Sequence, residues 1–393
     1  MNVLHTDFHR GWGGQAARVL MVCRELSGRG HRMLIAAPPG ELATRARDAG
    51  IEVDDGFAFR SPAHALSFIA DARRLSRIVR EREIDIVHTH GSQDTWVAAS
   101  LRATGSLPCG FVTTRHNTKP VRFSAANRYL YGRAVDHLIL VSESVRERFK
   151  PFLDAGLLAD GKITVAHSAY RADLFHEGVD ASPLRRRLGL EGRGPIVGVL
   201  ARLVEDKGHT HLFGAWERVR ARHPGAVLLV AGRGPLEARL RAEAEARGLS
   251  ESVRFLGFRD DAAELTALLD VAVLPSVGCD ASSASIKEAM AMARPVVATD
   301  VGGAREIIDE GVTGLVVPAA DLSALAAAIL ALLDDGGRSR AMGERARESV
   351  KSRFGAARLA GAELAVYERL LAARAGESAG AAASSARGSG SRA

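Results

Sequence analysis

The sequence predicts an α/β protein that contains two doubly wound parallel sheets. Short runs of β-branched residues alternate with longer amphipathic stretches, once in the first half of the chain and again in the second. Strands that alternate with helices are typical of parallel sheets covered by helices on both faces. The 393 residues are 47% hydrophobic and 25% charged, which is the balance of a globular protein long enough for two ordinary domains.

The first series of elements begins close to the N-terminus. We expect its strands near residues 2–5, 31–37, 84–89, 110–116, 136–142 and 162–167. We expect its helices near residues 15–28, 64–82, 94–103, 122–133 and 143–153. In the second series we expect helices in the gaps between strands near residues 195–201, 226–231, 252–256, 270–275, 295–299 and 314–317. Each series is about the size of one domain, so two Rossmann-like units are predicted.

The domain boundaries follow from changes in composition. We expect an N-terminal domain over residues 1–170 and a linker containing Gly and Pro over 171–194. A second domain is expected over 195–354, followed by a helix over 355–374 that packs back toward the N-terminal domain. Residues 375–393 are rich in Gly, Ala and Ser and lack apolar periodicity, so we expect a disordered tail.

Membrane-spanning and disulfide-stabilised proteins are disfavoured by the sequence. The longest uninterrupted apolar run, 324–333, is far shorter than the roughly 18 residues that a membrane span needs. No basic segment followed by an apolar core stands at the N-terminus, so we expect no secretory signal. Cys23, Cys109 and Cys279 lie far apart, so neither a disulfide framework nor a structural zinc site is expected. The expected location is therefore the cytoplasm.

Nucleic acid is also a disfavoured partner. The net charge is +7, but basic and acidic side chains are spread along the chain without a basic block. Aromatic residues make up only 5%, too few for a surface that stacks on single-stranded bases.

Three loops carry residues suited to an anionic or sugar ligand, because ligands of open parallel sheets bind where strands end and helices begin. The first loop, Gly11-Trp12-Gly13-Gly14-Gln15, follows the first expected strand and opens a helix. Glycines there allow close approach of a ligand to the helix N-terminus. A tight turn that binds nothing is the alternative interpretation.

The second loop contains Arg202 and Lys207 after the first strand of the second domain. An arginine can bind phosphate oxygens bidentately and a lysine adds a point charge, so the two cations could clamp a diphosphate. The alternative is that they form surface ion pairs with Glu205 and Asp206.

The third loop leads from the strand near 270–275 into a helix. Ser282 or Ser283 is a suitable N-cap for that helix, and Asp280 stands in the loop before it. Glu288 lies within the helix, where a carboxylate can hold ribose or sugar hydroxyls. The alternative is a surface glutamate beside Lys287. The later Gly302-Gly303 turn is interpreted mainly as architecture.

Taken in order, these segments resemble one family over about residues 1 to 370. They are GGQ, DIVHTH, ARLVEDKG, VAGRGP, VRFLGF, DASSASIKEAMAMARPVVATDVGGAREII and GVTGLVVP. The order is similar to that of the retaining glycosyltransferases of family 4, also called group 1. The resemblance implies the GT-B architecture, in which two Rossmann-like domains face each other across a cleft that holds a nucleotide-sugar donor.

The resemblance also implies roles for single residues. Arg202 and Lys207 match the cations that bind the donor diphosphate and assist catalysis. Gly13 and Gly14 match the glycine loop that approaches the donor phosphates and the acceptor. His116 resembles the active-site histidine near the transferred sugar; a structural histidine at a strand end is the alternative.

The remaining implied donor-binding residues belong to the third loop. Glu288 matches the second acid of an E-x7-E motif and is expected to hold the donor ribose. Asp280 replaces the first acid of that motif, and Ser282 and Ser283 are counted with the donor-binding residues. We interpret His88 and His90 as structural or acceptor-side residues, and we expect no metal ligand in the site.

Three positions depart from the family pattern. Asp280 is one methylene shorter than the usual Glu, which leaves the identity of the donor sugar open. Ala281 replaces a Gly, and Ser168-Ala169 replaces an Asn-Gly pair after the last strand of the first domain. A non-Gly residue tolerates a positive φ poorly, so we expect a different backbone there.

The expected function is transfer of a sugar from a nucleoside-diphosphate sugar, with UDP as the expected nucleotide, to a cell-envelope glycan or glycolipid such as a polysaccharide or lipopolysaccharide. The resemblance implies retention of configuration. We expect no metal or other cofactor, because Arg202, Lys207 and helix N-terminal N–H groups can stabilise the leaving diphosphate. No D-x-D pair stands where it could hold a divalent ion between phosphates. Two alternatives stay open: a nucleotide-sugar 2-epimerase of the same fold, and a nucleotide-sugar-binding subunit that lacks catalysis.

The acceptor and further partners are less defined. The stretch 64–82 is a basic amphipathic helix, which we interpret as a packed surface helix. The alternative is weak peripheral contact with the inner face of the cytoplasmic membrane, which would suit a lipid-linked saccharide acceptor. In both interpretations the apolar face of this stretch comprises Leu66, Ile69, Leu75, Ile78 and Val79. The sequence leaves the oligomeric state open.

Overall fold

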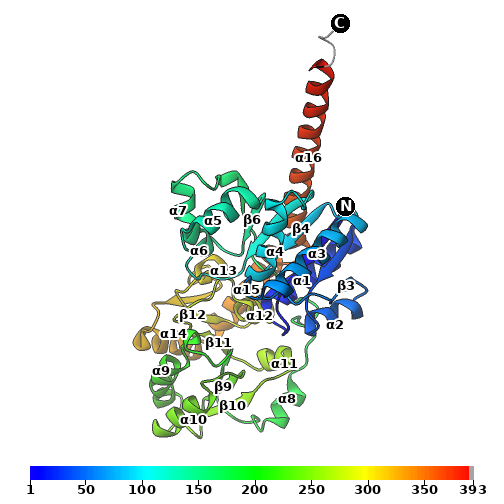
Figure 1. Ribbon diagram of the computed structural model, residues 1–393. Helices are drawn as coiled ribbons and strands as arrows, with labels where there is room; N and C mark the ends of the chain where they lie inside the picture. Colours follow the sequence, from blue (N-terminus) through cyan, green and yellow to red (C-terminus); the bar gives the residue numbers. More distant parts are fainter. Residues whose placement is uncertain (389–393) are drawn as a thin grey trace.

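Two parallel sheets form the centres of the two halves of the computed structural model, which describes residues 1–388 (Figure 1). In the N-terminal half the strand order is β3-β2-β1-β4-β5-β6-β7. The strands are β1 (Asn2–Thr6), β2 (Arg32–Ala36), β3 (Glu52–Asp54), β4 (Ile86–Thr89), β5 (Gly110–Arg115), β6 (His137–Leu140) and β7 (Ile163–Val165).

The second sheet has the order β10-β9-β8-β11-β12-β13, and all its strand pairs are parallel. Its strands are β8 (Ile196–Leu200), β9 (Val227–Ala231), β10 (Val253–Gly257), β11 (Val271–Leu274), β12 (Val296–Thr299) and β13 (Gly314–Val317). Both sheets are Rossmann-like and the fold is the GT-B architecture, which confirms the predicted fold class.

Helices connect the strands in both halves. In the N-terminal half these are α1 (Gly14–Gly28), α2 (Glu41–Asp48), α3 (Ala65–Glu81), α4 (Ser92–Ala103), α5 (Ala125–Tyr129), the π-helical turn η1 (Leu130–Ala134), α6 (Glu143–Arg146), η2 (Glu147–Phe149), α7 (Lys150–Asp154) and η3 (Asp160–Lys162). The C-terminal half contains α8 (Ser182–Arg187), η4 (Glu205–Lys207), α9 (His209–Arg222), α10 (Glu237–Ala246), α11 (Ala262–Ala267), α12 (Ala284–Ala291), α13 (Ala304–Ile307), α14 (Leu322–Asp334) and α15 (Gly336–Arg353). The chain ends in the long helix α16 (Ala356–Gly388).

Each strand expected from the sequence is present, whereas β3 and α2 were not predicted. β3 has only three residues and two of them are acidic, so it lacks the apolar run that marks the buried strands. In the segment expected to be a linker, the structure forms α8, with Pro183 in its first turn. In the segment expected to be a tail, α16 continues to Gly388, because alanine has a high helix propensity. Residues 389–393 of that segment lie outside the described part of the chain.

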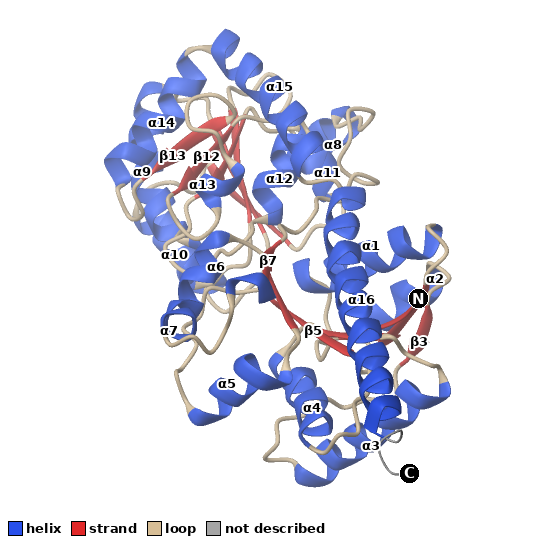
Figure 2. Ribbon diagram, turned by 90° about the horizontal axis from the view of Figure 1, so that it is seen from above, coloured by secondary structure: helices blue, strands red, loops and turns tan. Residues whose placement is uncertain are grey.

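α16 leaves the C-terminal half and lies beside α1 of the N-terminal half (Figure 2). The contact between α16 and α1 contains a fully buried ion pair. Arg18 Nη2 lies 2.6 Å from Glu363 Oε1, and neither side chain is exposed. Arg18 also donates to the carbonyl of Ala166 at 2.7 Å. α16 is therefore fixed to α1 and to the end of the N-terminal sheet by one buried guanidinium.

Direct hydrogen bonds also join the two halves near the cleft. The carboxylate of Glu306, on α13, accepts from the backbone N–H groups of Glu143 and Ser144, which open α6. Ala281, from the C-terminal half, packs into the apolar core of the N-terminal half. Within the described residues, no helix is both long and apolar enough for a membrane span.

Breaking the Arg18–Glu363 pair from one side tests its role in stability. We expect Glu363→Gln to lower the free energy of unfolding by about 3–5 kcal/mol, because it leaves the buried Arg18 charge unpaired. The double variant Arg18→Met/Glu363→Leu should lose less than this single variant, since it buries no charge. Urea unfolding measures the free energy of unfolding of the wild type, the single variant and the double variant.

The matched control is Arg24→Gln on the same helix. Arg24 forms an exposed pair with Asp173 at 3.9 Å, so its loss should change stability by less than about 1 kcal/mol. A Glu363→Gln variant as stable as the control would contradict the structural role of the pair.

Candidate functional site

A cleft of about 1330 Å³ lies between the two halves, at the ends of several strands. The residues predicted from the sequence lie in the loops after β1, β5, β8 and β11 or in the helix that follows the loop. All of them line this one cleft: Gly13, Gly14, His116, Arg202, Lys207, Asp280, Ser282, Ser283 and Glu288. The cleft is therefore the candidate site.

The loop after β8 presents the two predicted cations differently. The Arg202 side chain is exposed and forms no hydrogen bond or ion pair with any described residue. Lys207 Nζ lies 2.8 Å from Asp280 Oδ2, with both side chains largely buried. The alternative of surface pairs with Glu205 and Asp206 is not observed: among the described residues, Lys207 pairs with Asp280, and Glu205 pairs with Arg239.

Glycines hold the Asp280 loop against its neighbours. Gly302 has a φ of 59°, and a Cβ there would lie 2.0 Å from the carbonyl oxygen of Asp280. The N–H of Gly303 donates to that carbonyl at 3.1 Å. Ser276 Oγ donates to Asp280 Oδ2 at 3.2 Å. The Gly302-Gly303 turn, expected to be mainly architectural, therefore also fixes the loop that carries Asp280.

Glu288 lies on α12, which begins after the N-cap Ser283, whose Oγ accepts from Ile286 N–H. Arg171 Nε donates to Glu288 Oε1 at 3.0 Å. Burial raises the pKa of Glu288, and Arg171 opposes that shift. The sequence analysis did not identify Arg171 as a site residue. The signal available in the sequence was its position as a cation directly after the first domain, in the segment expected to be a linker.

Lys287 is fully buried and the Glu288 side chain is only 14% exposed, so the alternative of a surface glutamate beside Lys287 is not observed. Its ammonium group donates to the carbonyl of Ser168 at 2.5 Å and to Ser282 Oγ at 2.9 Å. Burial lowers the pKa of Lys287 to about 7, and the nearby Arg18 charge contributes to this shift. Ala169 next to Ser168 does not adopt a positive φ. Lys287 thus ties α12 to the end of the N-terminal domain.

The glycine loop borders the cleft from the other side. α1 starts at Gly14, and Gly13 is its N-cap with an extended backbone. A Cβ at either glycine would meet no other atom within 4 Å, so the first turn of α1 faces open space. Nearby, Asp7 Oδ1 accepts from His9 Nδ1 at 3.0 Å and from Gln15 Nε2 at 2.9 Å. The hydrogen bond to Asp7 raises the pKa of His9.

His116 follows β5 and is partly exposed to the cleft. Its Nε2 lies 3.1 Å from Nδ1 of His90, which also lines the cleft. Burial holds the pKa of His116 well below its usual value, and the charge of Arg18 adds to this. His116 therefore faces the cleft as a neutral imidazole. His88 lies behind, fully buried among other side chains.

Two family models match most of the chain between them. A model described as Glycosyltransferase Family 4 matches residues 12–174, and one described as Glycosyl transferases group 1 matches residues 194–335.

The chain is also similar in sequence or in structure to individual known proteins. The chain is 31% identical over 309 residues to a glycogen synthase of Mycobacterium tuberculosis, covering 75% of this chain and 70% of that protein. It is 30% identical over 351 residues to a GDP-mannose-dependent alpha-(1-6)-phosphatidylinositol monomannoside mannosyltransferase of the same species, covering 85% and 88%. Among solved structures, Anabaena HepE in complex with UDP matches with a TM-score of 0.81 and 22% identity, covering 94% and 100%.

The buried ammonium of Lys287 makes stability depend on pH. In the unfolded chain its pKa returns to about 10.5, so between pH 7 and 10.5 the unfolded state binds more protons than the folded state. We therefore expect the wild-type protein to gain stability relative to Lys287→Met as pH rises from about 7 to about 10.

Urea unfolding at several pH values measures this difference. Lys351→Met, which replaces a half-exposed lysine on α15, is the control and should show no such trend. A stability difference between wild type and Lys287→Met that stays constant over this range would contradict the assignment.

Proposed function

The chain belongs to the glycosyltransferases of group 1 and family 4, and we propose that it transfers a sugar from a UDP-sugar to a cell-envelope glycan or glycolipid with retention of configuration. The observation that carries this proposal is the convergence of Arg202, Lys207 and Glu288 on one cleft between two Rossmann-like domains. Two cations and one carboxylate suit a nucleoside diphosphate, whose phosphates are anionic and whose ribose offers hydroxyl groups.

The diphosphate is the leaving group, so the negative charge on it grows as the glycosidic bond breaks. Arg202, which has no partner among the described residues, is free to bind its oxygens. Lys207 would exchange part of its interaction with Asp280 for the phosphates. The N–H groups of the first turn of α1 add positive potential at Gly13 and Gly14. Groups aimed at the departing oxygens stabilise the transition state as an oxyanion hole does.

The same charges support a reaction without a metal ion, since the two cations supply the compensation that a divalent ion gives elsewhere. We assign no covalent nucleophile: the departing phosphate accepts the proton of the acceptor hydroxyl, which attacks the same face. Closure of the cleft excludes water and favours transfer over hydrolysis.

Glu288 would hold the donor ribose, and Asp280 the hydroxyls of the sugar. Arg171 now occupies one oxygen of Glu288, so the ribose must share that carboxylate or displace the guanidinium. Asp280 is drawn toward Lys207, which places its carboxylate beside the expected diphosphate. Phe258 lines the cleft, is 62% exposed, and offers an aromatic face to the nucleobase.

The similar proteins differ in the nucleotide with which they are described. HepE was solved with UDP, whereas the mannosyltransferase of M. tuberculosis is GDP-mannose-dependent. The latter also names a phosphatidylinositol glycolipid as acceptor, which supports a glycolipid acceptor here.

Nucleotide binding in the presence of EDTA tests the donor and the metal-free clamp together. We expect UDP to raise the Tm, whereas GDP, ADP and CMP should raise it less. At about 100 times its Kd a ligand contributes roughly 2.7 kcal/mol to stability. Glu288→Gln and Lys207→Met should reduce the shift, whereas Glu348→Gln on the exposed face of α15 should not. A shift that requires Mg²⁺, or one that both site variants retain, would contradict the proposal.

A lipid-linked acceptor would bring the protein to the membrane surface through α3. Leu75, Ile78 and Val79 of this helix are buried in the core, but Leu66 and Ile69 are 89% and 44% exposed. The apolar face expected from the sequence is therefore divided into a packed part and an exposed part. The exposed arginines Arg73 and Arg77 lie close to this exposed part, whereas Arg74 forms an ion pair with Asp54. We propose weak peripheral contact there, at the inner face of the cytoplasmic membrane.

Flotation with vesicles of anionic phospholipid measures this contact. The variant Leu66→Ser/Arg73→Gln/Arg77→Gln should float less than wild type, because it loses both apolar and ionic contributions. Arg338→Gln/Arg340→Gln on α15 is the charge-matched control and should float as wild type does. Equal flotation of all three proteins would exclude α3 as the contact.

A further inference from the structure

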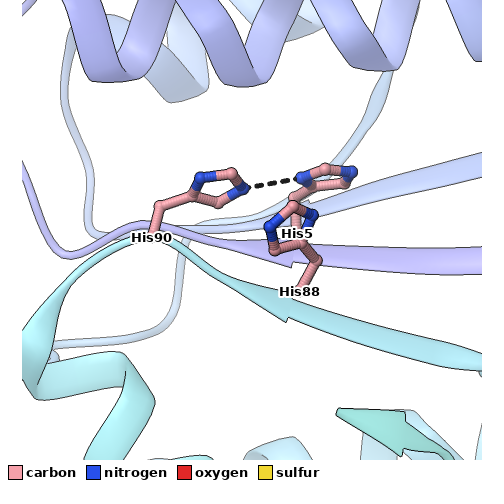
Figure 3. Close-up of side chains that lie close together, drawn as sticks. All are labelled: His5, His88 and His90. Carbon is pink, nitrogen blue, oxygen red and sulfur yellow. Dashed lines mark hydrogen bonds between the residues drawn. The ribbon is translucent and has the colours of Figure 1, made fainter. Parts of the chain in front are cut away.

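A line of histidines runs from the cleft into the core of the N-terminal domain. His116 Nε2 lies 3.1 Å from His90 Nδ1, and His90 Nε2 lies 2.8 Å from His5 Nδ1. Figure 3 shows the bond between His90 and His5, with His88 beside them. His5 and His88 are register partners on the adjacent strands β1 and β4, which brings their rings together.

The far end of this line is anchored on α16. Tyr367 Oη lies 2.6 Å from His88 Nδ1 and 3.5 Å from His5 Nε2. The same hydroxyl donates to Glu363 Oε2 at 3.1 Å. Glu363 Oε1 in turn accepts two hydrogen bonds from Arg18. We call the line from Arg18 through Glu363, Tyr367, His5 and His90 to His116 the histidine relay.

All imidazoles of the relay are neutral. Burial lowers the pKa of His5 to about 3 and holds those of His90 and His116 well below the usual value. The charge of Arg18 adds to this effect for each of them. A neutral imidazole has one N–H donor and one lone pair, so every hydrogen bond in the relay has a direction.

The carboxylate of Glu363 sets that direction, because it can only accept. The single hydroxyl hydrogen of Tyr367 goes to Glu363, so the Tyr367 oxygen can only accept from the rings. His5 therefore carries its proton on Nε2 and offers its Nδ1 lone pair to His90. His90 then carries its proton on Nε2 and accepts at Nδ1 from His116.

The branch at His88 follows the same rule. Its Nδ1 donates to Tyr367, so its Nε2 must accept, and Thr114 Oγ1 lies 2.7 Å from that atom as a donor. Each ring nitrogen of His5, His88 and His90 thus has a hydrogen-bond partner among the described residues. All three lone pairs are used as acceptors. A metal ion at this cluster would have to break those bonds, so we interpret the cluster as part of the relay.

We propose that Tyr367, His5 and His90 are positioning residues that fix His116 as the Nε2–H tautomer. The proton of His116 then points into the core, and its Nδ1, which bonds to no described residue, offers a lone pair to the cleft. His116 can accept a hydrogen bond from a substrate hydroxyl but cannot donate one. The identification of this hydroxyl as one of the donor sugar rests on the proposed function. The tautomer assignment rests on the hydrogen bonds of the relay alone.

The tautomer can be read directly from the ligand-free protein. In a sample with ¹⁵N-labelled histidine, long-range ¹H–¹⁵N correlation distinguishes a protonated ring nitrogen from one with a lone pair. We expect His116 to show one tautomer, with the proton on Nε2. In Tyr367→Phe, His5 loses the acceptor for its N–H, and His116 should become a mixture of tautomers. The effect would travel through His5 and His90, because the hydroxyl of Tyr367 forms no direct hydrogen bond with His116.

The control is Tyr129→Phe. Among the described residues, the hydroxyl that it removes bonds only to the carbonyl of Ala99, outside the relay. It should leave the His116 tautomer unchanged. His90→Phe removes the acceptor for the His116 N–H itself and keeps the test possible if Tyr367→Phe does not fold. An Nδ1–H tautomer of His116 in wild type, or a tautomer that neither relay variant changes, would overturn the proposal.

A second measurement separates positioning from a general structural effect. We expect Tyr367→Phe to lower kcat/KM for hydrolysis of UDP-glucose roughly tenfold, the size of one hydrogen bond, while the affinity for free UDP stays unchanged. An equal loss of UDP affinity would indicate distortion of the whole cleft and contradict positioning through His116. If UDP does not bind even to wild type, the proposed function fails, whereas the tautomer measurement still decides the relay.

Discussion

The buried ion pair between Arg18 and Glu363 is the interaction on which the arrangement of this protein depends. A guanidinium without access to water is stable only when its charge and its donors are satisfied, and here one carboxylate and the end of the N-terminal sheet do so. Glu363 lies on α16, so the pair fixes the last helix of the chain to the first helix of the N-terminal domain. The same carboxylate accepts a hydrogen bond from the Tyr367 hydroxyl and thereby sets the donor and acceptor roles in the hydrogen bonds between the histidines behind the cleft.

The cleft depends on a second set of contacts between the halves. Glu306 binds the start of α6, Lys287 binds the carbonyl of Ser168, and Arg171 binds Glu288. Each contact joins a helix of the C-terminal half to a segment that follows a strand of the N-terminal sheet. Two of these contacts are made by α12, which also carries Glu288, a residue predicted to bind the donor. The position of the two domains and the geometry of that part of the site therefore depend on the same hydrogen bonds.

The strands and the cleft could be predicted from the sequence because their signals are local. A buried parallel strand is a short apolar run, and the loop after it carries the ligand-binding residues such as Arg202 and Asp280. The short polar strand β3 lacks that signal. Arg171, Lys287 and Tyr367 could not be assigned, because each acts on a residue far away in the chain: Arg171 binds Glu288, and Tyr367 binds His88. Local spacing carries no information about such pairs.

The central claim is that Arg202 and Lys207 activate a nucleoside-diphosphate sugar in this cleft. The most direct measurement is NMR of UDP-glucose, GDP-mannose and ADP-glucose incubated with the protein in EDTA, with water in place of the acceptor. The account predicts slow release of the nucleoside diphosphate from one donor, with the freed sugar unchanged at every ring carbon other than C1. This release should be lost in Lys207→Met but not in Lys351→Met. Appearance of an epimeric sugar still joined to the nucleotide, or unchanged release by Lys207→Met, would contradict it.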